Sequence, residues 1–366
     1  MKVAIITIND NNNYGNRLQN YALQTFLKHY IDIVETLWYD ELTNFELKNI
    51  INLKSIIKFL INKNGYRDYL KKQYLKECIK IYNIKKFSQK YIDIKFINDL
   101  SKIPAQYDYF IVGSDQIWNP NFWLEKNNHA NIRFLKFTSK EKRIAYAASI
   151  AIPEIPKDKK QFFKDSLNEM KAISMREKAG ADLVKVLIGR EVPVVVDPTI
   201  LLSKEEWQKI EMRPEWYNDE KYILTYFLGN DSSIVQNIAK KNNWKIYNLM
   251  DSNDLELYTS RVEEFIFLIE HAQLVVTDSF HACVFSILLN TPFLVINRKQ
   301  KGVADMTSRI NTLLELFGYQ NRYIINGKSD LSDEEIIDMN FDNVKFIQEQ
   351  EKIRSLKYIK NALNLK

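Results

Sequence analysis

The 366-residue sequence lacks an unbroken apolar run of about 18 residues, the minimum for a helix that crosses a membrane. Its first residues, MKVAIITIND, contain one lysine and a short apolar run without a small-residue cleavage site, so they do not match a secretory signal peptide. We interpret them as a β-strand. These absences predict a cytoplasmic protein, which could also associate with the inner face of the plasma membrane.

Cysteine and histidine are scarce, with two and four residues respectively. The spacing of Cys78 and Cys283 suggests neither a disulfide framework nor a metal site, and we expect Cys283 to be a small core residue. So few candidate ligands argue against a zinc site, and we predict no metal. The GxGxxG fingerprint of dinucleotide-binding folds is also absent.

Positive charge is in modest excess, with a net charge of +6, and it is unevenly distributed. Residues 48–95 are dense in lysine, isoleucine and tyrosine. One interpretation is a helical segment with an apolar stripe and a solvated basic face, and the other is attraction to an anionic membrane surface or glycan. We favour the first, because lysines along amphipathic helices are commonplace. No nucleic-acid-reading motif accompanies the basic residues, so we predict no nucleic-acid partner.

Length and periodicity together predict two domains. The chain is too long for one ordinary core. Short β-like runs alternate with helical stretches in two series, and the second series begins at residue 222. This alternation predicts two Rossmann-like parallel-sheet α/β domains that face each other. We place the N-terminal domain at 1–205 and the C-terminal domain at 206–340, and we expect a C-terminal helix at 341–366 to pack back on the N-terminal domain.

Segment 274–298 carries the most informative pattern: a short apolar strand, a polar turn, an apolar helix and a second strand. It places Asp278, Ser279 and His281 at the carboxyl end of a strand and the N-terminus of a helix. Open parallel sheets bind ligands at that position, and helix N-termini favour anions. A lone histidine is more often structural, but its polar neighbours make His281 our candidate for proton transfer. Arg309, in a later helix, is within reach of the same cleft.

A second polar cluster follows the apolar run that ends near residue 112, and it combines hydrogen-bond donors, an acid and an aromatic ring. Its members are Gly113, Ser114, Asp115, Gln116 and Trp118. Such a mixture suits a sugar, whereas the alternative is a structural Asx-turn with a buried tryptophan. We favour the functional interpretation because so many polar side chains converge.

A third cluster follows the first strand and contains Asn13, Gly15 and Asn16. Glycine allows a tight turn there, and the amides could open an anion site at a helix N-terminus. The alternative is a capped surface loop. The pattern favours neither interpretation.

Arg176 stands next to Glu177 after an apolar run, and two interpretations are open. The pair could form an internal ion pair, or Arg176 could aim its bidentate fork at a phosphate or carboxylate. Residues 192–201 predict a further strand. Asp197, at the end of that strand, is interpreted as part of a structural turn before proline.

In this order the clusters resemble the motifs of the polysaccharide pyruvyl transferase family. The segments concerned are NYGNRLQNYALQ, YDYFIVGSDQIWNP, RIAYAAS, SMREKAG, VVVDPTILL, TDSFHACVFSILLNTPFLVI and SRINTLLELFG. Each segment is weak alone, but the ordered set is specific. The resemblance spans roughly residues 2–320.

The resemblance implies a fold like that of GT-B glycosyltransferases and a reaction of bacterial surface polysaccharide synthesis, such as that of capsule, lipopolysaccharide or cell-wall glycan. Phosphoenolpyruvate would donate a pyruvyl group to two hydroxyls of a glycan or lipid-linked oligosaccharide, giving a cyclic ketal and phosphate. No metal or organic cofactor is implied. The N-terminal domain would bind the acceptor and the C-terminal domain the donor.

The resemblance also implies roles for individual residues. His281 and Asp115 would be catalytic, with His281 as the acid or base and Asp115 near the acceptor. The donor-binding residues would be Arg176, Ser279, Phe280 and Arg309. The residues lining the acceptor side of the cleft would be Asn13, Gly15, Asn16, Gly113, Ser114, Gln116, Trp118 and Asp278.

One position departs from the family pattern. Several members carry arginine two residues before the motif histidine, where it helps to hold the donor carboxylate, and here that residue is Ser279. Either another cation, such as Arg309 or Arg298, serves instead, or the donor differs. Two alternatives stay open: a GT-B-type glycosyltransferase that uses a nucleotide sugar, and a non-catalytic glycan-binding protein of the same fold. A homo-oligomer is also left open.

Overall fold

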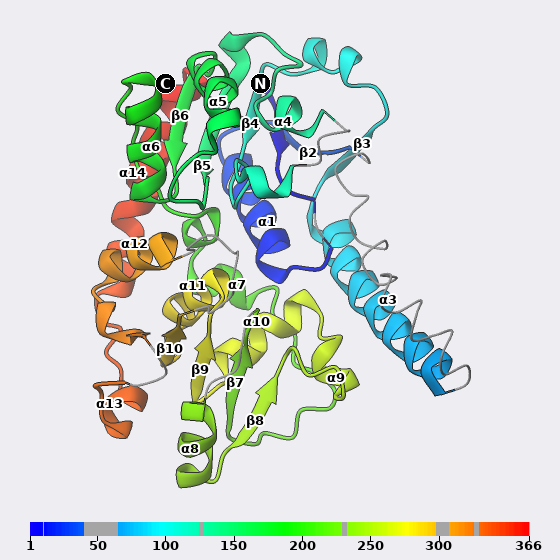
Figure 1. Ribbon diagram of the computed structural model, residues 1–366, viewed down its shortest axis with the longest axis vertical. Helices are drawn as coiled ribbons and strands as arrows, with labels where there is room; N and C mark the ends of the chain where they lie inside the picture. Colours follow the sequence, from blue (N-terminus) through cyan, green and yellow to red (C-terminus); the bar gives the residue numbers. More distant parts are fainter. Residues whose placement is uncertain are drawn as a thin grey trace.

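The computed structural model describes residues 1–9, 11–39, 65–123, 128–228, 233–297, 307–325 and 329–365. In these residues the chain forms two parallel β-sheets, each flanked by helices, one above the other in Figure 1. The predicted fold class is therefore confirmed: two Rossmann-like parallel-sheet domains face each other in a GT-B-like arrangement.

The N-terminal sheet has six parallel strands in the order β3-β2-β1-β4-β5-β6. These strands are β1 (Lys2–Ile6), β2 (Ile33–Tyr39), β3 (Ile94–Ile97), β4 (Tyr109–Val112), β5 (Arg143–Ala148) and β6 (Ala172–Met175). The order reverses between β1 and β4, and doubly wound sheets bind ligands outside the carboxyl ends of the strands at such a switch point. The loop before α1 (Tyr14–Lys28) and the turn 113–119 both open there.

The C-terminal sheet has five parallel strands in the order β11-β10-β9-β7-β8. These strands are β7 (Tyr222–Tyr226), β8 (Lys245–Asn248), β9 (Leu274–Thr277), β10 (Phe293–Ile296) and β11 (Tyr323–Ile324). The switch point of this sheet lies between β7 and β9. The polar turn after β9, which starts α11 (Phe280–Leu289), opens at that point.

Helices cover both faces of each sheet (Figure 1). The longer ones besides α1 and α11 are α3 (Gly65–Tyr91), α5 (Lys160–Asn168), α6 (Lys178–Ile188), α8 (Ser233–Asn242), α10 (Val262–Glu270), α12 (Thr307–Phe317) and α14 (Val344–Leu363). The shorter ones are α4 (His129–Arg133), α7 (Lys204–Gln208), α9 (Leu255–Tyr258) and α13 (Asp333–Ile337). Because both sheet faces are covered, the central strands are near-continuous apolar runs. None of the helices in the described ranges combines the length and apolarity that a membrane crossing needs.

Residues 192–201 do not form the predicted strand. Val194 makes a single bridge to Met175, and the chain then enters a 3-10 turn, η8 (Pro198–Leu201). Proline has no N–H to donate, so Pro193 and Pro198 prevent a regular ladder. The apolar residues Val195, Val196, Ile200 and Leu201 are buried all the same.

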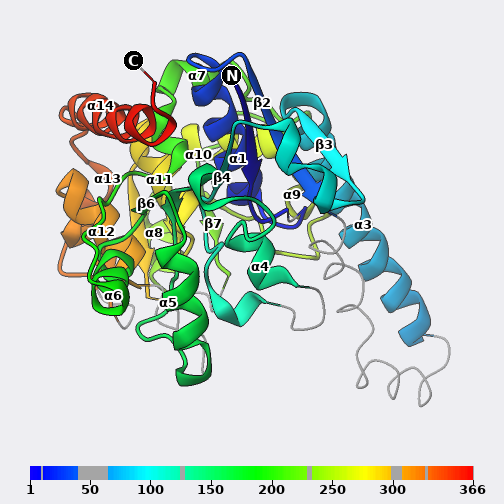
Figure 2. The same cartoon turned by 90° about the horizontal axis from the view of Figure 1, so that it is seen from above.

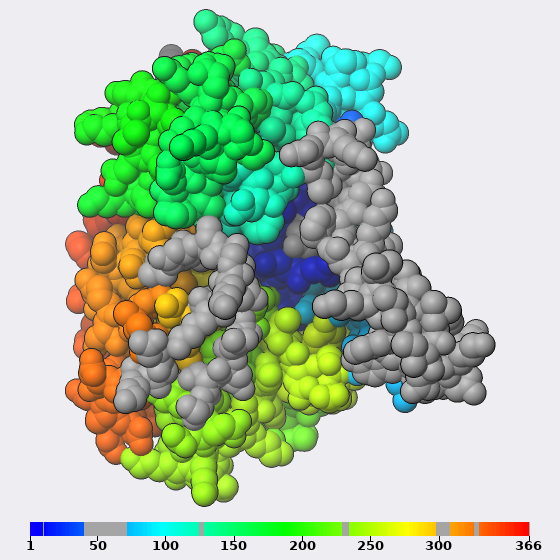
Figure 3. Space-filling model, in the orientation of Figure 1, coloured from blue at the N-terminus to red at the C-terminus, as the bar shows by residue number. Residues whose placement is uncertain are grey.

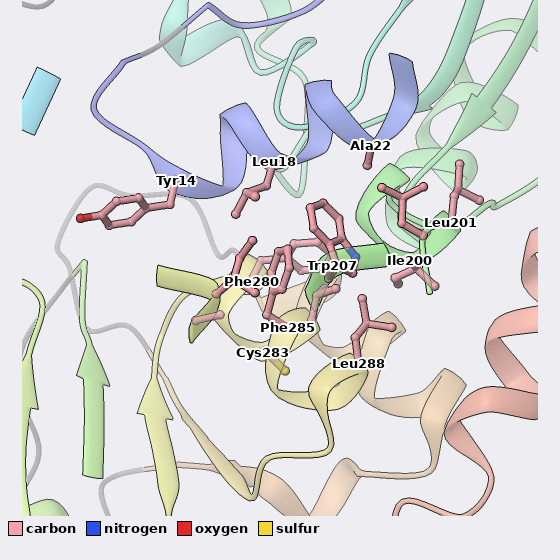
Figure 4. Close-up of a cluster of buried hydrophobic side chains, with 14 of the residues drawn as sticks. Tyr14, Leu18, Ala22, Ile200, Leu201, Trp207, Phe280, Cys283, Phe285 and Leu288 are labelled. Atoms are coloured by element: carbon pink, nitrogen blue, oxygen red, sulfur yellow. The ribbon is translucent and has the colours of Figure 1, made fainter. Parts of the chain in front are cut away.

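A continuous apolar cluster joins the two domains (Figure 4). Tyr14 of α1 stacks on Phe265 of α10 with ring centroids 4.8 Å apart, and its hydroxyl donates a hydrogen bond to the carbonyl of Ser260 at 2.9 Å. Trp207 packs edge-on against Phe285 of α11 at 4.8 Å. Full burial of one such aromatic side chain contributes about 1.5–3 kcal/mol. The apposition of α1 and α11 therefore rests on packing.

The C-terminal helix α14 crosses back to the N-terminal domain. Gln348 donates hydrogen bonds to the carbonyls of Ile200 and Leu202 at 2.9 and 2.7 Å, in the connection between the domains. The Tyr358 hydroxyl donates to the carbonyl of Ala145 in β5 at 2.7 Å. Figures 1 and 2 show α14 and α3 on opposite sides of the molecule.

The lysine-rich segment is helical from residue 65 to 91, and its first part, 48–64, lies outside the described residues. One face of α3 is apolar, with Ile84 and Phe87 fully buried. Asn83 donates a hydrogen bond to the carbonyl of Thr259 at 2.6 Å, so α3 also contacts the C-terminal domain. An apolar inner face with lysines outside is what the amphipathic interpretation predicts.

Candidate active site

The two switch points meet where α1 and α11 begin, and glycine makes their close approach possible. A Cβ atom placed on Gly15 would lie 2.1 Å from Nδ1 of His281, far inside van der Waals contact. The close approach of His281 in α11 thus requires glycine at residue 15. In the space-filling view, N-terminal residues in dark blue are visible in a hollow between the domains (Figure 3).

His281 is enclosed by both domains and is 6% exposed. Its Nε2 atom lies 3.6 Å from Oδ2 of Asp197, beyond hydrogen-bond distance, and has no hydrogen-bond partner in the described part of the chain. An unsatisfied ring nitrogen in a buried site is unusual, because buried polar atoms are normally paired. The imidazole is therefore held in place while one nitrogen is left for a further partner.

Asp197 is the central acceptor of the cluster. Its Oδ2 accepts hydrogen bonds from Arg176 Nη1 at 2.8 Å and Ser114 Oγ at 3.1 Å, while Oδ1 accepts from the hydroxyl and the backbone N–H of Thr199. Burial alone would raise the pKa of Asp197, but His281 and Arg176 outweigh it and hold that pKa well below its usual range. The predicted turn before proline exists, and the same side chain also anchors the site.

Asp115 sits in the turn after β4 with a left-handed backbone, φ 52°. Its carboxylate accepts hydrogen bonds from Asn16 Nδ2 at 3.3 Å and Arg176 Nη2 at 3.4 Å. Burial raises the pKa of Asp115, but the charges of Arg176, His281 and Arg309 bring it below its usual value. A carboxylate with a lowered pKa is a weak proton acceptor, so Asp115 is better suited to orienting a hydroxyl than to deprotonating it.

Arg176 is surrounded by carboxylates. Its Nη atoms reach Asp197 and Asp115, and Nε lies 3.9 Å from Oε2 of Glu177. Burial lowers the pKa of Arg176, and the three carboxylates more than restore it, with a net rise. Its guanidinium carbon also lies 4.5 Å from the centroid of the Phe280 ring. The geometry thus favours the interpretation of Arg176 as part of an internal ion pair over that of a cation aimed at a phosphate or carboxylate.

Arg309, in the first turn of α12, joins the cluster from the C-terminal domain. Its Nη1 lies 3.9 Å from Oδ1 of Asp115, and its guanidinium carbon lies 5.9 Å from the Phe280 ring centroid. The structure therefore brings Arg309 and Phe280 to the predicted cleft. Arg298, the other cation considered for the donor, lies outside the described residues.

A pocket of about 310 Å³ adjoins the cluster on the side of α12 and α14. Its lining residues are Arg176, Val194, Val195, Val196, Asp197, Ile200, Phe280, Arg309, Thr312, Leu313, Glu315, Leu316, Glu351 and Arg354. Cations, carboxylates and apolar side chains therefore share one cavity next to the paired residues. In size it matches the lower end of small-molecule sites.

Several predicted cleft residues serve the turns that carry the site. Asn13 accepts a hydrogen bond from the N–H of Asn16 and caps α1, and Ser279 caps α11 through the N–H of Ala282. Asp278 accepts from the N–H of Leu228 at 2.7 Å. These bonds hold the two turns in position.

Gly113 and Gln116 also support the turn after β4. A Cβ on Gly113, which has φ 130°, would lie 2.1 Å from the carbonyl oxygen of Tyr146 in β5. Gln116 accepts a hydrogen bond from Nδ2 of Asn119 at 2.9 Å. Glycine at 113 thus lets the turn pack against the neighbouring strand.

Trp118 is a correction to the sequence analysis. Its ring is fully buried, stacks on Phe134 at 4.9 Å, and donates a hydrogen bond from Nε1 to the carbonyl of Arg133 at 2.9 Å. It belongs to the apolar core of the N-terminal domain and offers no platform to a sugar. The buried tryptophan of the alternative interpretation describes it correctly.

The sequence analysis missed two residues at the site, Gln19 and Arg133. Gln19 accepts a hydrogen bond from the N–H of Ser114 at 3.1 Å and donates one to Thr7 at 2.8 Å, which ties α1 to both strands of the switch point. Its i+4 spacing from Gly15 could have revealed it. Arg133 is buried near Asp115, and no sequence pattern marks it.

Within the described ranges, no group of three or more histidine, cysteine or acidic residues is arranged to hold a metal ion. Cys78 and Cys283 are both free thiols, and Cys283 is buried in α11 as expected. The candidate site is therefore a cluster of arginines, carboxylates and one imidazole at the junction of the two sheets.

Comparison with known proteins adds a family and a set of distant structures. A family model described as polysaccharide pyruvyl transferase matches residues 13–300. No curated protein matches the sequence. Among solved structures, S. aureus MnaA with UDP has 12% identity and a TM-score of 0.48, covering 100% of this chain and 98% of its own. Anabaena HepE with UDP and glucose has 11% identity and a TM-score of 0.48, covering 100% of both chains. UDP-GlcNAc 2-epimerase from Neisseria meningitidis has 10% identity and a TM-score of 0.43, covering 97% and 100%.

Proposed function

The chain belongs to the polysaccharide pyruvyl transferase family, and we propose that it transfers a pyruvyl group from phosphoenolpyruvate to two hydroxyls of a glycan sugar. The observation that carries this proposal is the buried imidazole of His281, whose Nε2 has no hydrogen-bond partner in the described residues although two carboxylates and two arginines surround the ring. Proton transfer between carbon and oxygen at neutral pH needs a group of this kind.

In the proposed reaction, protonated His281 gives its proton to the methylene carbon of the enol, where a C–H bond forms. One sugar hydroxyl adds to the adjacent carbon and loses its proton to the imidazole. The bond from that carbon to the phosphate oxygen then breaks, and phosphate leaves with the bonding electrons and takes up the proton. The second hydroxyl adds and returns a proton to His281. One proton ends on carbon and one on phosphate, which accounts for both hydroxyl protons.

The surrounding residues divide the remaining tasks. The Asp197 carboxylate, 3.6 Å from Nε2, keeps the imidazole oriented. Asp115 and Asn16 belong to the N-terminal domain and would accept and donate hydrogen bonds to the sugar hydroxyls. Arg309 and Phe280 belong to the C-terminal domain and would contact the donor, with Ser279 capping the helix beneath it. This keeps the acceptor on the N-terminal side and the donor on the C-terminal side.

The experiment is a donor screen with purified protein and a panel of glycan and lipid-linked acceptors. With phosphoenolpyruvate we expect release of phosphate and an acceptor that gains one pyruvate less one water. His281→Ala should abolish turnover while the thermal unfolding temperature stays near that of the native chain. Release of UDP from UDP-N-acetylglucosamine, with none of phosphate from phosphoenolpyruvate, would instead identify a glycosyltransferase. Acceptor binding without turnover of either donor would identify a glycan-binding protein.

The outer face of α3 is the surface that we propose for contact with a membrane that carries a lipid-linked acceptor. Lys72, Tyr82, Lys85 and Lys86 are exposed on it, and the Lys86 Nζ lies 4.6 Å from the Tyr82 ring centroid. Basic residues beside an aromatic ring suit an anionic interface. The native chain should sediment with vesicles that contain phosphatidylglycerol and less with pure phosphatidylcholine. The variant Lys85→Glu/Lys86→Glu should lose this difference, and equal binding by both proteins would contradict the assignment.

A further inference from the structure

Arg133 is a buried guanidinium without a hydrogen-bond partner for two of its nitrogens. The residue is 5% exposed, and neither Nε nor Nη1 makes a hydrogen bond within the described structure. A guanidinium has five N–H donors, and a buried charge without a partner is among the most costly features in a protein. Such a group needs an explanation.

Two other arginines are buried to a similar degree and show how the chain usually treats this side chain. Arg143 donates to the carbonyl of Thr138 and to the carboxylate of Glu169 at 2.7 Å. Arg322 donates to the carbonyls of Ile336 and Glu335 at 3.0 and 2.8 Å. In both, Nη1 and Nη2 donate to protein oxygens. Nη1 of Arg133 has no such acceptor, whereas in Arg322 the unpaired atom is Nε alone.

Arg133 is next to the candidate site and is held there firmly. Its carbonyl accepts the hydrogen bond of Trp118 Nε1, three residues after Asp115, so α4 and the turn after β4 form one packed unit. Burial lowers the pKa of Arg133 to about 10, and the charge of Asp115 opposes this shift. The guanidinium therefore stays charged at neutral pH. Asp115 itself is already bound by Asn16 and Arg176, so it does not serve as a dedicated counter-ion.

We propose that Arg133 binds an anionic oxygen of a substrate, a phosphate or carboxylate, on the Asp115 side of the cleft. An oxyanion would supply the acceptors that the buried nitrogens lack, and the planar guanidinium pairs with such groups in a bidentate manner. Two sources share this chemistry: phosphoenolpyruvate and an acidic sugar of the acceptor. This inference deepens the proposed function, on which the identity of the substrate rests, but binding itself does not require turnover.

The test is anion binding by calorimetry, with inorganic phosphate, phosphoenolpyruvate and glucuronate as separate probes. Arg133→Gln should lower the affinity for the probe that the native chain binds best at least tenfold, which corresponds to about 1.4 kcal/mol. Arg133→Lys should recover part of the affinity. Loss confined to phosphate and phosphoenolpyruvate assigns the donor as the source, and loss confined to glucuronate assigns the acceptor. Arg322→Gln is the matched control, because it removes an equally buried arginine and should leave all three affinities unchanged.

Stability separates this role from a structural one. Without ligand, Arg133→Gln removes an uncompensated buried charge, so its thermal unfolding temperature should equal or exceed that of the native chain. A structural arginine would behave in the opposite way. The inference is overturned if Arg133→Gln and Arg133→Lys bind every probe as the native chain does, or if no probe binds the native chain. Anion binding lost in Arg133→Gln with no turnover in the native chain would refute the proposed function and leave this site in place.

Discussion

Replacing Gly15 with alanine tests the contact on which the candidate site depends. A Cβ at residue 15 would lie 2.1 Å from Nδ1, 2.2 Å from Cγ and 2.6 Å from Cβ of His281. Non-bonded carbon atoms pack at about 3.5–4.0 Å. Rotation about χ1 does not move the Cβ of His281, so rotation of the imidazole cannot relieve the overlap. The first turns of α1 and α11 must therefore separate by roughly 1 Å or more.

The expected effects on stability and rate differ in size. Overpacking costs about 1–3 kcal/mol, and alanine recovers up to about 1 kcal/mol over glycine in a helix. The unfolding free energy should therefore fall by no more than about 3 kcal/mol. A displacement of about 1 Å at a catalytic group can lower the rate by about 100-fold. Phosphate release from phosphoenolpyruvate should accordingly fall far more than the population of folded protein.

Gly180→Ala is the matched control, because Gly180 also lies in the first turn of a helix, α6. A Cβ at residue 180 would lie closest to the terminal Cε of Met175, at 2.8 Å, which is the end of a flexible side chain. This variant should keep both stability and rate. If Gly15→Ala also keeps full rate and unfolds at the native temperature, the close approach of α1 to His281 is refuted.

Three further predictions concern polar groups that are buried or half-buried. Asp197→Asn should lower the unfolding free energy by about 3–5 kcal/mol in urea titrations, because Arg176 loses a buried ionic partner. Unchanged stability would contradict the role of Asp197 as the central acceptor of the cluster. Burial and the neighbouring Glu270 raise the pKa of Glu211 from 4.5 to about 7. Protonation of Glu211 therefore favours the folded state. This contribution to the unfolding free energy is complete below pH 4.5 and is lost as the pH rises through 7. Glu211→Gln should flatten the fall in unfolding temperature between pH 4.5 and pH 7. An unaltered dependence of the unfolding temperature on pH would exclude the interaction of Glu211 with Glu270. Trp118→Phe should cost about 1–3 kcal/mol by leaving the Arg133 carbonyl unpaired, and an unchanged unfolding free energy in urea titrations would contradict this role of the hydrogen bond.

The elements were predictable where local pattern and burial agree. Strand β9 is apolar, and helix α11 is buried along its whole length, begins after the capping Ser279 and ends at Asn290 in a left-handed conformation. Each of these signals is local, so residues near it in sequence are sufficient to read it. Residues 192–201 show the limit of such reading, because the apolar run is real but its prolines prevent strand pairing.

Partners across the cleft were not predictable, because they are set by packing between domains. Gly15 and His281 are 266 positions apart, and only the apposition of α1 and α11 brings them together. The choice between an ion pair and a free cation at Arg176 likewise depends on carboxylates from three separate loops. Strand ends identify candidate residues, whereas their charge environment requires the tertiary structure.

The charges around His281 explain why Arg133 matters to an anionic donor. Two arginines, Arg176 and Arg309, face three carboxylates, Asp115, Asp197 and Glu177, which leaves one net negative charge. Arg133 brings this balance to zero. Because Ser279 contributes no charge, phosphoenolpyruvate should bind less tightly once the charge of Arg133 is removed. Calorimetric titrations at a single pH should show this loss of affinity in Arg133→Gln and not in Arg322→Gln. Equal affinity in the native chain and in Arg133→Gln would refute this account of the charge.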